Sequence, residues 1–81
     1  SGLILRMGDW MLQQACEALA RLQSAQRLVS LSVNVSQRQF RQDDFVERVR
    51  AVLELTGAPA DHLILEVTES LLIEDLEHTI S

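Results

Sequence analysis

The sequence predicts an α/β protein in which helices alternate with the parallel strands of one sheet. Amphipathic stretches with apolar residues three and four positions apart indicate helices. Two short stretches, residues 28–35 and 62–67, have the length and apolar character of strands. The predicted order is helix, strand, helix, strand, helix. Strands separated by helices form βαβ units with a parallel sheet.

The first predicted element is an amphipathic helix over residues 9–26. Its apolar positions follow helical spacing and are Met11, Leu12, Ala15, Cys16, Leu19 and Leu22. We expect Trp10, which opens this helix, to pack against a neighbouring element. Cys16 is the only cysteine, so no intramolecular disulfide can form. We therefore expect it to be a buried apolar side chain rather than a reactive thiol.

The second predicted element is the strand over residues 28–35, in which apolar and small polar residues alternate. Small polar residues suit a strand that is covered on both faces. Directly after the strand, Ser36 and Gln39 have the spacing of a capping box. This spacing predicts a short helical turn that ends near Phe40.

A longer helix is predicted next, with Asp43 or Asp44 as its N-cap and its end near Thr56. Gly57 suits the C-terminal cap of this helix, and Pro59 prevents it from continuing. The expected buried stripe of the helix consists of Phe45, Val49, Val52 and Leu53.

The second strand is predicted over residues 62–67, and a last helix is expected to begin near Leu72. A single βαβ unit with further helices leaves both edges of its sheet unpaired. Both ends of the chain also lie in apolar or helical sequence. We therefore expect an internal segment of a larger domain, completed by the rest of that domain or by other copies of this chain.

The composition narrows the classes of function. Seven arginines and no lysine leave a net charge of −5, which argues against binding of a nucleic-acid polymer. A small anionic ligand held through a metal ion is compatible with this charge. No apolar run reaches the length of a membrane span, and nothing resembles a signal peptide. We expect a cytoplasmic segment without membrane contact of its own, although other domains of the protein could tether it to a membrane.

The two predicted strands end in similar sequences. Asn34 is followed by a valine, a hydroxyl residue and an amide, and Glu66 by a valine, a hydroxyl residue and a carboxylate. In a parallel sheet both polar side chains stand at the carboxyl edge, where α/β proteins gather ligands and catalytic groups. Such oxygen ligands suit a hard cation such as Mg2+ or Mn2+. Alternatively, Asn34 hydrogen-bonds a turn and Glu66 pairs with an arginine.

Four sequence blocks, in order and at matching intervals, carry a family resemblance. Residues 2–16 read GLILRMGDWMLQQAC, residues 33–40 read VNVSQRQF, and residues 63–70 read LILEVTES. Asp44 and Phe45 supply a further DF pair. These blocks resemble the GLIxxLGxWVLxxAC, VNxSxxQF, LxLEITES and DF elements of the EAL domain family, the cyclic di-GMP-specific phosphodiesterases. The resemblance covers essentially the whole chain.

This resemblance implies a TIM-like (β/α) barrel, of which residues 1–81 supply roughly a third if about 250 residues are typical. It also implies hydrolysis of cyclic di-GMP to linear pGpG with Mg2+ or Mn2+. By position, Asn34 and Glu66 are metal ligands, and Glu69 orders a neighbouring active-site loop. Gln39 and Phe40 lie where the family chain passes close to the bound nucleotide.

Other parts of the family pattern are missing from these 81 residues. Residues 17–19 spell the Glu-Ala-Leu signature by coincidence, since they fall within the first predicted helix and lack the arginine that follows the signature. The DDFGTG element and the catalytic lysine are absent.

Three hypotheses remain: a segment of an active phosphodiesterase, inactive in isolation; a segment of a degenerate domain that binds cyclic di-GMP without cleaving it; or an interaction module that self-associates through its sheet edges.

Overall fold

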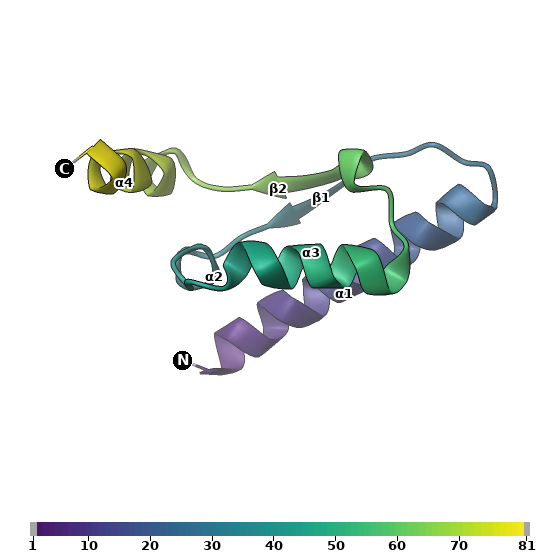
Figure 1. Ribbon diagram of the computed structural model, residues 1–81, viewed down its shortest axis with the longest axis horizontal. Helices are drawn as coiled ribbons and strands as arrows, with labels where there is room; N and C mark the ends of the chain where they lie inside the picture. The colour runs from purple at the N-terminus through teal and green to yellow at the C-terminus, as the bar shows by residue number, and fades with distance from the viewer. Residues whose placement is uncertain (1, 81) are drawn as a thin grey trace.

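Helices and strands alternate in the computed structural model, which describes the backbone of residues 2–80 and the side chains of residues 7–77, 79 and 80 (Figure 1). The elements are α1 (Gly2–Ser24), β1 (Leu31–Asn34), α2 (Gln37–Phe40), α3 (Phe45–Thr56), η1, a 3-10 turn (Ala60–His62), β2 (Leu63–Glu66) and α4 (Glu69–Ile80). This order confirms the predicted α/β class.

The two strands form a parallel pair, and α3 is the crossover helix between them. The register pairs Leu31 with Leu63 at one end and Asn34 with Glu66 at the other. The pairing continues for one further bond, because the Val35 N–H donates to the Glu66 carbonyl over 2.9 Å. Both strands point toward the same end of the molecule, where α2 and α4 begin (Figure 1).

Helix α1 crosses beneath the sheet and contacts both strands as well as α2 and α3 (Figure 1). It buries Leu12, Cys16 and Leu19, which are three or four residues apart and share one face of the helix. The strand residues Val33 and Val35 are buried as well. Because side chains alternate along a strand, the burial of Val33 turns its neighbour Asn34 to the opposite face.

A charged cluster joins α1 to α3. Arg48 of α3 donates from Nη2 to the Asp9 carboxylate of α1 over 2.7 Å. The same guanidinium also donates to Gln42 and lies 3.8 Å from Asp44. Asp44 holds the predicted N-cap position of α3, but its side chain makes no capping hydrogen bond and faces Arg48 instead. The cluster therefore fixes the start of α3 against α1.

Several predicted boundaries are confirmed by the cap geometry. Ser36 and Gln39 form the expected capping box at the start of α2, which ends at Phe40. Gly57 ends α3 in the left-handed conformation with φ 72°, which glycine adopts without strain. Its N–H donates to the Leu53 carbonyl over 2.9 Å, as in a helix-ending αL motif.

Other predictions about the elements are wrong. The first helix begins at Gly2, not near residue 9, because residues 3–7 contain neither glycine nor proline and Gly8 alone does not interrupt the helix. The strands are shorter than predicted, since residues 28–30 have no strand partner among the described residues. Helix α4 begins at Glu69, three residues before Leu72, because Thr68 supplies its cap.

The packing predictions also need correction at two places. Trp10 lies inside α1 and is 60% exposed, so most of its surface is not packed against another described element as predicted. The apolar stripe of α3 is only half-buried, and no α3 residue is fully buried. Among residues 2–80, no helix is long and apolar enough to cross a membrane.

The burial of Cys16 leads to a first prediction. Its side chain is 0% exposed, and burial raises the pKa of the Cys16 thiol because the thiolate loses its hydration. The folded protein therefore favours the neutral Cys16 thiol. This contribution to stability is fully present below the thiol pKa of the unfolded chain, about 8.5, and is lost as the pH rises through the raised pKa of the folded chain. We expect slow native-state labelling by a thiol reagent at pH 8 and rapid labelling in urea. Equal rates under the two conditions would contradict the burial of Cys16.

Candidate metal and phosphodiester site

Asn34 and Glu66 lie side by side at the carboxyl ends of the two strands. They are direct register partners, and neighbouring strands are about 4.8 Å apart. Both side chains are exposed and share a face of the sheet with Ser32 and Ile64, while Val33 is buried on the other face. The geometry thus brings together the two residues singled out as metal ligands.

Neither side chain has a partner among the side chains that the structure describes. No hydrogen bond or ion pair of the described residues involves the Asn34 amide or the Glu66 carboxylate. Among the described side chains, the two alternatives, a turn hydrogen bond for Asn34 and an arginine partner for Glu66, are therefore not realised. The amide oxygen and the carboxylate remain open to an additional partner.

The donor set fits part of the coordination shell of a hard divalent cation. Mg2+ prefers oxygen ligands and usually takes about six of them, including water. Asn34 and Glu66 offer an amide and a carboxylate oxygen from adjacent strand ends. Across the described part of the chain, no group of three or more His, Cys, Asp or Glu residues could hold a metal. The two residues can thus contribute to a metal site but do not complete one.

The repeated sequence at the strand ends has a structural cause, because a hydroxyl residue caps the following helix in both cases. Ser36 Oγ accepts a hydrogen bond from the Gln39 N–H over 3.2 Å at the start of α2. Thr68 Oγ1 accepts one from the Leu71 N–H over 3.1 Å at the start of α4. Only two residues separate each strand end from its helix, so a capped helix restrains the backbone just after Asn34 and just after Glu66.

Glu69 is the first residue of α4, and its side chain is exposed. A carboxylate in the first turn of a helix interacts favourably with the partial positive charge of the helix N-terminus. No described residue forms a hydrogen bond or ion pair with its side chain. Its role in ordering an active-site loop therefore stays a prediction that concerns residues outside this structure.

Gln39 and Phe40 have packing partners in the structure. The Gln39 side chain is only 4% exposed, and its Oε1 accepts from the Ser36 N–H over 3.0 Å to close the capping box. The side chain also rests on α1 at Gly8, where an added Cβ would lie 2.2 Å from it. The Phe40 ring is half-buried and meets the Phe45 ring at a centroid distance of 6.0 Å. Contact of either residue with a nucleotide stays a prediction.

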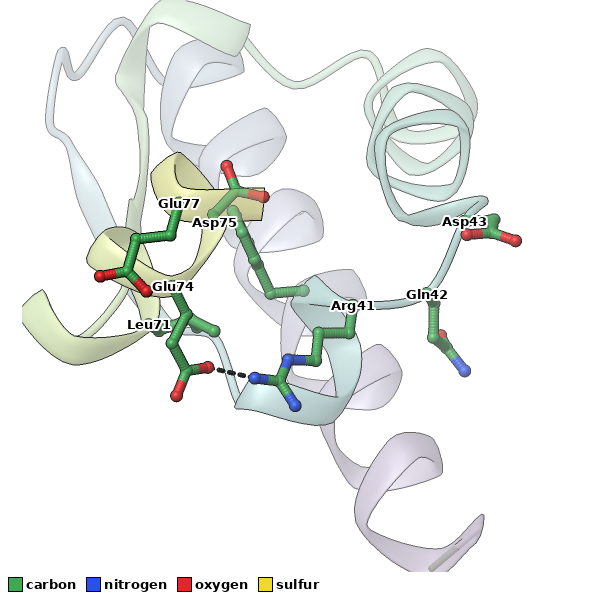
Figure 2. A pocket seen from close by; sticks show the side chains of 8 residues that line it. Arg41, Gln42, Asp43, Leu71, Glu74, Asp75 and Glu77 are labelled. Atoms are coloured by element: carbon green, nitrogen blue, oxygen red, sulfur yellow. Dashed lines mark hydrogen bonds and ion pairs between the residues drawn. The ribbon is translucent and has the colours of Figure 1, made fainter. Parts of the chain in front are cut away.

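The structure adds a pair that the sequence analysis missed. Arg41, directly after α2, donates to the Glu74 carboxylate on α4 (Figure 2). Gln37 donates from Nε2 to the same Glu74 oxygen over 3.1 Å. Arg41 and Glu74 border an open pocket of about 820 Å³, which lies between the α2–α3 connection and α4. Local sequence patterns contain no signal for the pair, because its members belong to consecutive βα units far apart in the chain.

A parallel βαβ unit with oxygen-bearing side chains at adjacent strand ends is typical of an α/β barrel or doubly wound sheet. The chain has the fold of part of a TIM-like barrel, since it superposes on a structure of the MucR phosphodiesterase in complex with c-di-GMP. The TM-score is 0.82 at 36% sequence identity, and the match covers 95% of this chain and 33% of that chain.

This chain belongs to the EAL domain family, whose model matches residues 1–81. It is 36% identical over 78 residues to the bifunctional diguanylate cyclase/cyclic di-GMP phosphodiesterase MucR of Pseudomonas aeruginosa, a match that covers 95% of this chain and 11% of that protein. It is 35% identical over 81 residues to the cyclic di-GMP phosphodiesterase NbdA of the same organism, covering 99% of this chain and 10% of NbdA. It is also 42% identical over 77 residues to the uncharacterized protein y4lL of Sinorhizobium fredii, covering 95% of this chain and 9% of that protein. The chain thus spans about a tenth of the length of these relatives.

The contact between Gly8 and Gln39 generates a second prediction. Gly8→Ala alone would raise helix propensity by about 1 kcal/mol, which favours folding. We expect a net loss of stability instead, because overpacking costs about 1–3 kcal/mol and the Gln39 amide is held by its capping bond. Thermal unfolding midpoints measure this change.

The matched control repeats the substitution in a Gln39→Ala background, where the added methyl group has room. There, Gly8→Ala should raise the unfolding midpoint. The same sign of effect in both backgrounds would show that Gln39 does not rest on Gly8.

Proposed function

We propose that this chain supplies two metal-binding strand ends to a phosphodiesterase that hydrolyses cyclic di-GMP to linear pGpG with Mg2+ or Mn2+. The observation that carries the proposal is the register pairing of Asn34 with Glu66, both exposed and without a partner among the described side chains. Membership of the EAL domain family and the names of the relatives support the substrate class.

The proposed contribution of each residue follows from its chemistry. Asn34 and Glu66 would hold a divalent cation from adjacent strand ends, and the exposed sheet face lets a ligand approach that cation. The bound cation would neutralise phosphate charge and lower the pKa of an attacking water molecule. Ser36 and Thr68 keep the two ligands in place by capping the helices that follow. Glu69 would order a neighbouring loop from the first turn of α4.

We further propose that the active protein is an intact barrel, meaning this chain joined to the remainder of an EAL domain. This chain covers 33% of the MucR phosphodiesterase chain, and its two oxygen ligands fill only part of a cation's shell. The remaining ligands and the catalytic lysine would come from the rest of the barrel, or in part from other copies of this chain. A degenerate barrel that binds cyclic di-GMP without cleaving it is the alternative.

The ligand assignment leads to a third prediction for the intact barrel. Loss of a residue that only orients a metal ligand costs about 10–100-fold in affinity or activity. We therefore expect Asn34→Ala and Glu66→Ala to lower metal-dependent hydrolysis of cyclic di-GMP by more than about 100-fold. Ser32→Ala is the matched control, because Ser32 lies on the same exposed face one pleat earlier.

Wild-type turnover in either ligand variant would contradict the assignment. Binding of cyclic di-GMP by the intact barrel without any turnover would favour the receptor alternative. Isothermal titration and separation of linear pGpG from cyclic di-GMP distinguish these outcomes.

A fourth prediction concerns the 81 residues alone. We expect no hydrolysis of cyclic di-GMP by the isolated chain, because it carries only part of the metal site. Incubation of the purified chain with cyclic di-GMP and Mn2+ measures this. Turnover that disappears in a Glu66→Gln variant would show that the chain, or an assembly of its copies, is sufficient.

A further inference from the structure

Glu74 joins α4 to both ends of α2. Gln37 is the first residue of α2, and Arg41 is the residue that caps its C-terminus. Both side chains donate to the same oxygen, Oε2 of Glu74. Figure 2 shows the contact between Arg41 and Glu74. We call these three residues the α2–α4 tie. Its members come from the two segments that directly follow β1 and β2.

The α2–α4 tie links two helices, each of which is joined to its strand by a connection of two residues that a helix cap restrains. Asn34 is separated from α2 by Val35 and Ser36, and the capping box fixes that connection. Glu66 is separated from α4 by a valine and by Thr68, whose hydroxyl caps α4. A displacement of α2 relative to α4 is therefore transmitted to Asn34 relative to Glu66.

We propose that Glu74 is a positioning residue that sets the separation of the Asn34 and Glu66 oxygens for a shared divalent cation, an inference that rests on the proposed function. Mg2+ requires near-octahedral geometry with short ligand distances, so small changes in ligand separation alter its affinity. Glu74 touches neither the cation nor the substrate in this assignment and acts through the backbone.

The size of the effect follows from the exposure of the tie. The side chains of Arg41 and Glu74 are 57% and 49% exposed, so their ion pair is screened by solvent. Pairs of this kind contribute modestly, and the second donor, Gln37, adds a hydrogen bond of 3.1 Å to the same carboxylate. We expect removal of Glu74 to weaken cation binding by about two- to fivefold without unfolding the protein.

Glu74→Ala in the intact barrel tests the inference, with Asp75→Ala as the matched control. Asp75 is the next residue on α4 and lines the same pocket, but its carboxylate points away from Arg41 (Figure 2). Mn2+ binding is measured by the electron paramagnetic resonance signal of free Mn2+, which does not require turnover. The Mg2+ concentration for half-maximal hydrolysis is measured in parallel.

We expect Glu74→Ala to raise both the Mn2+ dissociation constant and the half-maximal Mg2+ concentration about two- to fivefold, with kcat unchanged at saturating Mg2+. Asp75→Ala should leave both values unchanged. The charge-reversed double variant Arg41→Glu/Glu74→Arg should recover much of the wild-type affinity, because it restores the ion pair across the same gap.

Equal Mn2+ affinity in Glu74→Ala and Asp75→Ala would overturn the positioning role. Wild-type protein that binds Mn2+ but does not cleave cyclic di-GMP would refute the proposed hydrolysis, and the Mn2+ affinities would still decide the role of Glu74. Wild-type protein that binds no Mn2+ would refute both.

Discussion

The packing of α1 against the paired strands is the constraint on which the remaining structure depends. A two-stranded sheet is marginally stable by itself and needs a partner that covers one face. The buried face of α1, with Leu12, Cys16 and Leu19, provides that cover. Once Val33 is buried on this side, the period of two along a strand sends Asn34 to the open face. A slip of one residue would reverse these positions and remove Asn34 from the site.

Much of the candidate site could be predicted because it follows from such local rules. Strand alternation, parallel pairing and the repeated strand ends predict Asn34 beside Glu66, and the spacing of Ser36 and Gln39 predicts the capping box; the structure confirms both. The start of α4 was missed because Thr68 and Glu69 suit a turn as well as a helix N-terminus. A helix begins here because the Thr68 hydroxyl accepts a hydrogen bond from the Leu71 N–H. Whether this bond forms depends on the folded backbone and not on the local sequence.

Contacts between distant segments could not be predicted, for a different reason. The fit of Gln39 over Gly8 and the ion pair of Arg41 with Glu74 join residues whose separation depends on the crossing of whole elements. Neither contact has a sequence period or a short-range spacing. Trp10 is the reverse case, since a large aromatic residue is expected to be mostly buried, yet the described residues leave 60% of it exposed.

The chain exposes apolar surface away from the candidate site, on helix α4 and between α3 and β2. Helix α4 buries Leu71 on one side and carries on the other Leu72, Ile73, Leu76 and Ile80, which are 47–84% exposed. A second, apolar pocket of about 540 Å³ lies between α3 and β2. Contiguous apolar surface of this kind marks an interaction site or an aggregation hazard. In the proposed intact barrel, neighbouring βα units would cover it.

Strand pairing and apolar burial determine the fold around the candidate site, whereas the helix caps and the α2–α4 tie affect only its local geometry. Backbone pairing and apolar burial fix which residues face the ligand, because a slip in register would remove several of these contacts together. The helix caps and the α2–α4 tie are individually worth about 1 kcal/mol or less, which is too little to select the fold. That amount is sufficient to change the affinity for a cation by several-fold, since 1.4 kcal/mol corresponds to a factor of ten. Half-exposed contacts around the paired strands can thus tune the proposed metal site while the fold remains unchanged.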